Sequence, residues 1–203
     1  MDRLSVYIDG FNLYFGISDR GRRRYLWLDL VALARRLAKP DQTLAAIKYF
    51  TARVREDKAK IRRQATYLQA LEEGGGITIQ YGRYQRRSKE CHQCHAAWNE
   101  YEEKMSDVKL ATELLRDAFK DEFETALIIT GDGDLVPPIA AVKEDFPDKK
   151  VVIVFPPERD NPRLTEVADE SFRLGRGRLA KCQLPYVVTK KNGYKLIKPG
   201  EWK

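Results

Sequence analysis

The sequence has few cysteines, which stabilise many secreted proteins as disulfides, and it lacks the long apolar runs of membrane proteins. It contains three cysteines and two histidines among 203 residues. No apolar run approaches the roughly 18 residues that span a bilayer, so we expect no integral membrane protein. The N-terminal segment shows no charged region followed by a long apolar stretch, so we expect no secretory signal. Three cysteines without such a signal favour a reducing cytoplasm over a disulfide framework.

The chain has enough apolar side chains for a folded domain. Hydrophobic residues make up 43% of the sequence and charged residues 33%, which argues against a disordered or collagen-like chain. The formal net charge is +7, compatible with a polyanionic partner. Residues 173–203 hold nine Lys or Arg and a single acid, and a second basic stretch at 83–89 surrounds Tyr81 and Tyr84. Cations with interleaved aromatic rings are typical of nucleic-acid binding, although solvated surface charges are the simpler interpretation.

Apolar runs of strand length alternate with segments of helical periodicity. This pattern predicts an α/β fold, a three-layer α/β/α sandwich with a mainly parallel central sheet. The expected strands span residues 4–8, 46–54, 77–81, 126–130 and 151–155, and the expected helices span 27–38, 58–71, 101–119 and 135–142.

We expect one main domain over residues 1–173 and a basic C-terminal extension over 174–203. Residues 83–99 break every periodic pattern, which indicates an insertion within the domain. In the extension, the Asn192-Gly193 pair is the favoured centre of a β-hairpin.

Four aspartates occupy positions that a parallel sheet brings to one edge. Asp9 ends the first strand, Asp132 and Asp134 follow the fourth, and Asp107 heads the helix that leads into the fourth. Ligands bind outside the carboxyl ends of such strands. Clustered carboxylates repel one another unless a cation neutralises them, and hard oxygen ligands favour Mg²⁺ or Mn²⁺. The simpler alternative for Asp132 or Asp134 alone is a helix cap.

Three segments carry a resemblance to a known family. In chain order they read VYIDGFNLYFGI, KMSDVKLATELL and ALIITGDGDLVPPI. Together they resemble the NYN domain, a branch of the PIN-like ribonuclease superfamily, and within it the bacterial group related to LabA. The similarity covers roughly residues 4–155. It implies a PIN-like fold and metal-dependent endonuclease chemistry, chiefly on RNA.

The resemblance also implies roles for individual residues. Asp9, Asp107 and Asp132 would hold one Mg²⁺ or Mn²⁺, and Asp134 would supply a further ligand. Asn12 would orient a water or the scissile phosphate, and Thr130 stands where the family pattern has a small hydroxyl residue. By analogy, the products would carry a 5′-phosphate and a 3′-hydroxyl. Gly133 and Leu135 replace a more familiar Ser and Phe, and neither change removes a ligand.

Two further sets of residues are candidate ligands or substrate contacts. Arg83, Arg86 and Arg87 in the insertion are expected to contact the RNA, with Asn12 and Thr130. Beside them, Cys91 and Cys94 form half of a structural zinc motif, and several LabA-like proteins carry a similar insertion. Either His92 or His95, with Cys182 as a candidate from elsewhere, could complete the site. A redox-sensitive thiol pair and surface cysteines without a ligand are the alternatives.

The leading function is a metal-dependent ribonuclease, and the runner-up is an RNA- or protein-binding module with little catalysis. A haloacid dehalogenase-like phosphatase needs an Asp-x-Asp pair after the first strand, and here Gly10 and Phe11 follow Asp9. A dinucleotide-binding enzyme needs a glycine-rich turn there. Whether the chain forms a homo-oligomer is left open by the sequence, since a C-terminal hairpin could bridge two chains.

Two aromatic residues follow closely after Asn12. We expect Phe15 to pack in the core, while Tyr14 could stack on a base.

Overall fold

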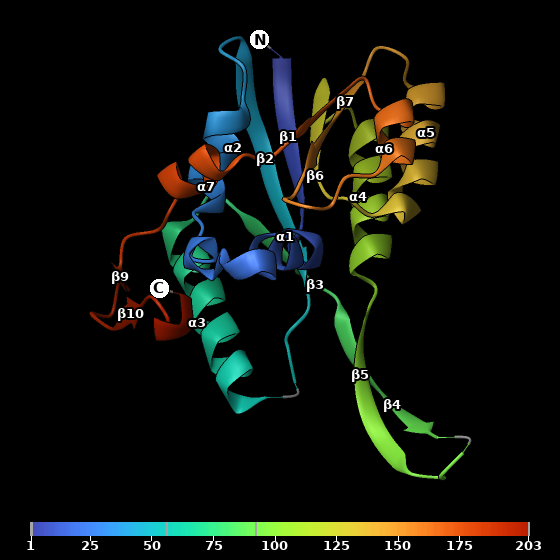
Figure 1. Ribbon diagram of the computed structural model, residues 1–203. Helices are drawn as coiled ribbons and strands as arrows, with labels where there is room; N and C mark the ends of the chain where they lie inside the picture. Colours follow the sequence, from blue (N-terminus) through green and yellow to red (C-terminus); the bar gives the residue numbers. More distant parts are fainter. Residues whose placement is uncertain (1, 56, 92, 203) are drawn as a thin grey trace.

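A six-stranded parallel sheet forms the centre of the molecule (Figure 1). The computed structural model describes residues 2–55, 57–91 and 93–202, without the side chains of Arg20, Arg86, Arg87 and 99–103. The strand order is β3-β2-β1-β6-β7-β8. These strands are β1 (Asp2–Asp9), β2 (Gln42–Thr51), β3 (Thr78–Tyr81), β6 (Thr125–Ile129), β7 (Lys150–Phe155) and β8 (Glu170–Arg173).

Helices cover both faces of the sheet and create two hydrophobic cores. Alternate residues of β1 point to opposite faces, so Leu4, Val6 and Ile8 enter one core and Tyr7 enters the other. The first core also contains side chains of α2 (Leu30–Leu37), α3 (Lys58–Gly74) and α7 (Arg176–Lys181). The second contains side chains of α4 (Ser106–Phe119), α5 (Val136–Asp145) and α6 (Pro162–Val167). The predicted three-layer sandwich is therefore confirmed. No helix in the described part of the chain is long and apolar enough to cross a membrane.

The insertion is an antiparallel hairpin that projects from the body of the molecule (Figure 1). Its strands are β4 (Arg83–Glu90) and β5 (Ala97–Lys104). The helix expected from residue 101 was wrong at its start, because residues 101–104 pair with residues 83–86 in the hairpin. Met105 then takes a left-handed conformation with φ of 80°, and α4 begins at Ser106. Met105 is thus the single residue between the end of β5 and the start of α4.

The C-terminal segment folds back onto the first core. After α7, strands β9 (Val187–Thr189) and β10 (Lys195–Ile197) form a second antiparallel pair. Gly193 lies in the turn between them with φ of 83°. The final 3₁₀ turn, η4 (Gly200–Trp202), buries Trp202 against Trp27 and Tyr67, with ring centroids 6.3 and 5.8 Å away.

A buried polar network attaches α4 to the sheet. Lys48 Nζ on β2 lies 2.6 Å from a Glu113 oxygen and 2.8 Å from an Asp117 oxygen, both on α4. The Tyr7 hydroxyl on β1 donates a hydrogen bond of 2.5 Å to Asp117 Oδ2. Asp117 is 5% exposed, so these bonds take the place of its water contacts. The network fixes the position of the helix that carries Asp107.

Replacing Asp117 with Ala should destabilise the protein by about 3 kcal/mol, because it removes one partner of a buried ion pair and leaves the Tyr7 hydroxyl without its acceptor. Urea unfolding followed by circular dichroism measures the change. Glu122→Ala, at an exposed position nearby, is the matched control and should shift the midpoint little. Equal stabilities of the two variants would contradict a stabilising role for the network.

Candidate metal centre

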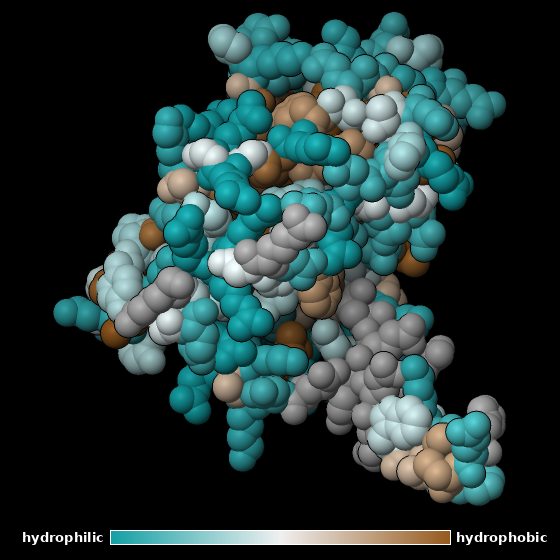
Figure 2. Space-filling view, in the orientation of Figure 1, coloured by the Kyte–Doolittle hydropathy of each residue, from teal (hydrophilic) through white to brown (hydrophobic). Residues whose placement is uncertain are grey.

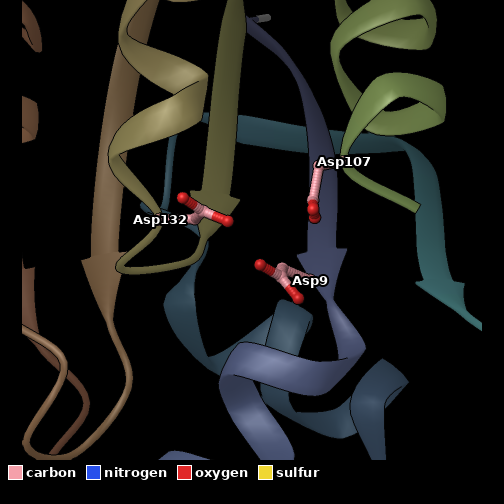
Figure 3. A group of neighbouring side chains, drawn as sticks. All are labelled: Asp9, Asp107 and Asp132. Carbon is pink, nitrogen blue, oxygen red and sulfur yellow. The ribbon is translucent and has the colours of Figure 1, made fainter. Parts of the chain in front are cut away.

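Three aspartates from distant parts of the chain meet at the carboxyl edge of the sheet (Figure 3). Asp9 ends β1, Asp132 follows β6, and Asp107 lies in the first turn of α4. One carboxylate oxygen from each lies within 4.8 Å of the others, and we call these three residues the aspartate cluster. β1 and β6 are neighbours where the strand order reverses, which is the usual ligand site of an open parallel sheet.

Asp9 is held in place by the start of α1 (Gly10–Ser18). Its Oδ1 accepts a hydrogen bond of 3.0 Å from the backbone N–H of Asn12 and so caps this helix. The helix begins with Gly10 because the neighbouring strand is too close for a side chain. A Cβ at this position would lie 2.6 Å from the Phe50 carbonyl oxygen and 2.8 Å from the Tyr49 ring. The close approach of β2 therefore depends on this glycine.

Thr130 connects Asp9 to the loop that carries Asp132. Its hydroxyl donates a 3.0 Å hydrogen bond to Asp9 Oδ2 and accepts one of 3.0 Å from the backbone N–H of Asp132. The side chain is 0% exposed, so it cannot reach a substrate. This geometry corrects the expected substrate contact of Thr130, because the hydroxyl positions two members of the cluster instead.

Asn12 and Gly131 complete the connection between β1 and β6. Asn12 Oδ1 accepts a 3.2 Å hydrogen bond from the Gly131 N–H, and its side chain also hydrogen-bonds to Asp9. Gly131 packs directly against the segment after β7, where a Cβ would lie 2.0 Å from the Arg159 carbonyl oxygen. Asn161 donates a 3.2 Å hydrogen bond to the Gly131 carbonyl from the same side. The described contacts therefore make Asn12 a positioning residue for Asp9.

The environment of Asp9 disfavours its charged form. Burial raises the pKa of this carboxyl above its ordinary value, and the nearby charge of Asp132 raises it further. Hydrogen bonds from Asn12 and Thr130 act in the opposite direction. A bound cation would remove the unfavourable term, since an opposite charge favours the ionised carboxylate. The oxygen-only donor set fits Mg²⁺ or Mn²⁺, which prefer carboxylate ligands.

Asp134 lies outside the aspartate cluster, although the resemblance implied a ligand. It is exposed, and its backbone N–H donates a 3.0 Å hydrogen bond to Asp132 Oδ1. Asp132 thus also caps the short turn η3 (Gly133–Leu135), as the cap alternative expected, while remaining in the cluster.

The predicted RNA-contacting arginines and the three cysteines lie in the hairpin and in the first core. Arg83 is exposed and lines a shallow hollow together with Arg53 and Arg55 at the end of β2. The side chains of Arg86 and Arg87 lie outside the described residues. Cys91 and Cys94 lie at the hairpin tip, whereas Cys182 is buried in the first core and is no partner for them.

An aromatic cavity beside the cluster was missed by the sequence analysis. It has a volume of about 550 Å³, and Gly10, the residue after Asp9, is part of its lining. Rings of Phe11, Tyr14, Phe15 and Tyr84 line it. Phe15 was expected in the core and is instead 47% exposed, because Leu13, Gly16 and Ile17 form the buried side of α1. The spacing of residues 11, 14 and 15 places three rings along one helix face, and that signal was available in the sequence.

Comparisons with known proteins agree with this architecture. The family model of the NYN domain, a PIN-like nuclease family, matches residues 3–175. A named relative, 6-hydroxy-3-succinoylpyridine 3-monooxygenase HspA of Pseudomonas putida, is 30% identical over 98% of this chain and 75% of its own length. The crystal structure of VPA0982 from Vibrio parahaemolyticus, described as a protein of unknown function, aligns with a TM-score of 0.56 and 17% identity. That alignment covers 86% of this chain and 94% of VPA0982.

Adding Mn²⁺ should raise the melting temperature of the wild-type protein, because the cation binds the folded cluster. At a hundredfold excess over the Kd, binding contributes about 2.7 kcal/mol, or about 5–10 °C for a chain of this size. Asp107→Asn should remove most of this shift, and Asp134→Asn should keep it. Differential scanning fluorimetry with and without chelator measures both. An undiminished shift in Asp107→Asn would place the cation outside the cluster.

Proposed function

The chain belongs to the NYN domain family, and from this premise we propose that it is a metal-dependent endoribonuclease acting at the aspartate cluster. The observation that carries the proposal is the convergence of Asp9, Asp107 and Asp132 at the switch point of the sheet. The negative charges of such a cluster repel an anionic substrate unless a cation neutralises them. A protein that only binds polyanions would gain nothing from it, which argues against the binding-module alternative.

The cluster would hold one Mg²⁺ or Mn²⁺ through Asp9, Asp107 and Asp132. When bound, such a cation neutralises the phosphodiester and activates a water for attack on phosphorus. Thr130 and Asn12 keep the Asp9 carboxylate oriented, and second-layer contacts of this kind set the geometry of metal ligands. By analogy with the superfamily, hydrolysis would leave a 5′-phosphate on one fragment and a 3′-hydroxyl on the other.

The surroundings of the cluster support a single-stranded RNA substrate. Phe11 lies 6.1 Å from Tyr84 and 6.4 Å from Phe15 between ring centroids, so the three rings are neighbours in the lining of the cavity. Unpaired bases stack on such surfaces whatever their sequence. The cations that line the same cavity could neutralise the phosphates. They are Arg23, Lys60 and Arg63.

The named relative raises a second candidate function, a monooxygenase of an aromatic substrate. Its identity of 30% and the aromatic cavity favour this candidate. Non-haem iron oxygenases bind their metal with two histidines and one carboxylate. Among the described residues, no histidine joins the aspartate cluster, and His95 instead bonds to Glu90 in the hairpin. The donor set therefore favours hydrolysis, and both activities can be measured side by side.

Wild-type protein should cut an end-labelled RNA in Mn²⁺ and not in chelator. Asp107→Asn should reduce the rate about 100-fold or more, because it removes a metal ligand from the folded protein. Glu122→Gln, at an exposed site in the loop after α4, is the matched control and should cut normally.

A parallel assay should follow oxygen consumption with 6-hydroxy-3-succinoylpyridine and a reduced nicotinamide donor. Oxygen consumption without RNA cleavage would refute the proposed nuclease activity and support a monooxygenase activity. RNA binding by gel shift, with neither reaction, would favour the binding module.

Replacing Tyr14 with Ala should weaken binding of single-stranded RNA by about 1–3 kcal/mol, because one stacking ring is lost. Tyr14 is 39% exposed, so the fold should tolerate the change. Binding of duplex RNA should change little, since paired bases cannot stack on the ring. Fluorescence anisotropy in Ca²⁺ compares the two substrates, with Tyr186→Ala as an exposed aromatic control in the C-terminal segment. An equal loss for both substrates would refute stacking at this surface.

A further inference from the structure

The tip of the β4–β5 hairpin holds two thiols, Cys91 and Cys94, in one tight turn. The Cys91 N–H donates to the Ala96 carbonyl at 3.0 Å, and the His95 N–H donates to the Cys91 carbonyl at 2.9 Å. His95 takes a left-handed conformation with φ of 53°, which turns the chain back after Cys94. The turn is therefore closed by backbone hydrogen bonds and by one residue in an unusual conformation.

The Cys91 sulfur is already surrounded by donors. The backbone N–H groups of Gln93 and Cys94 and the Cys94 thiol hydrogen-bond to it. The same donors can hydrogen-bond to a metal-bound sulfur, and such contacts orient a metal ligand. The geometry of the turn therefore presents the Cys91 sulfur as a ligand. The adjacent Cys94 sulfur offers a second ligand at the same place.

Two sulfurs make half of a structural zinc site, which takes four ligands in a tetrahedron. Among the described residues, no third Cys, His, Asp or Glu forms a group with them within 4.8 Å. His95 Nδ1 bonds to Glu90 at 2.8 Å. Cys182 is 2% exposed in the first core and directly follows α7. Figure 1 shows α7 well separated from the tip of the β4–β5 hairpin.

The position of the tip makes it accessible to another molecule. The hairpin extends away from the sheet, and its tip stands clear of the body in the space-filling view (Figure 2). Cys94 and its neighbours at the turn are exposed. A second copy of the same hairpin can therefore approach tip to tip, and a two-fold axis through the metal would present two sulfurs from each side.

We propose that Cys91 and Cys94 of two copies of this chain bind one zinc ion, which joins the hairpin tips in a homodimer. Each coordinated thiol releases its proton to solvent, so the site contains four thiolates and one Zn²⁺. The zinc is structural and separate from the aspartate cluster. Because β5 passes into α4 through Met105 alone, the bridge would also set the separation of the two Asp107 side chains.

The test uses the full chain, reduced and freed of metal, to which Zn²⁺ alone is added. Light scattering after size exclusion measures the mass, and elemental analysis measures zinc. Zinc bound at the aspartate cluster is subtracted with the double variant Cys91→Ser, Cys94→Ser, whose positions at the hairpin tip lie outside both hydrophobic cores. We expect a dimer, about one zinc per two chains in the difference, and return to monomer in chelator or in the double variant.

Two further variants separate this arrangement from its alternatives. Cys182→Ala and the double variant His92→Ala, His95→Ala should both keep the zinc and the dimer. One zinc per monomer, loss of zinc in the histidine variant, a dimer that persists without both cysteines, or no zinc difference at all would each overturn the proposal. The outcome is independent of nuclease activity, since none of these variants alters the aspartate cluster.

Discussion

A carboxylate that is 3% exposed lies at the end of β1, and much of the carboxyl edge of the sheet is arranged around it. Asp9 receives hydrogen bonds from Thr130, which follows β6, and from Asn12 on α1. Asn12 in turn holds Gly131, and Gly131 packs on the Arg159 carbonyl after β7. The segments that follow β1, β6 and β7 are thus connected around one buried carboxylate, and this close packing explains the glycine at position 131.

The same constraint connects the site to the rest of the protein. Asp107 reaches the cluster only if α4 is held against β1 and β2, and the Lys48–Asp117 pair with the Tyr7 hydroxyl provides that attachment. The other end of the arrangement is the hairpin, which passes into α4 through Met105. The hairpin, the ion pair and Asp107 are therefore all connected through α4.

The positions of the acidic and basic side chains around the cluster are compatible with a polyanionic ligand. Acids are buried or half-buried at the sheet edge, whereas Arg53, Arg55 and Arg83 lie exposed beside it. Under the proposed function, an anionic strand would contact these cations along its backbone while one phosphate met the cluster through a metal ion. The aromatic cavity lined by Gly10 would then offer a surface for unpaired bases.

The sequence by itself determined the alternation of strands and helices and the location of acids at strand ends. These features follow from periodic burial and local caps, which neighbouring residues specify. Only the tertiary structure decided that Asp134 stays outside the cluster, that Phe15 is exposed and that Cys182 is remote from the hairpin. The hydrogen bond between Asp9 and Thr130 joins residues 121 positions apart. Contacts of this kind depend on which strands become neighbours and which way each side chain turns, and no local pattern records either.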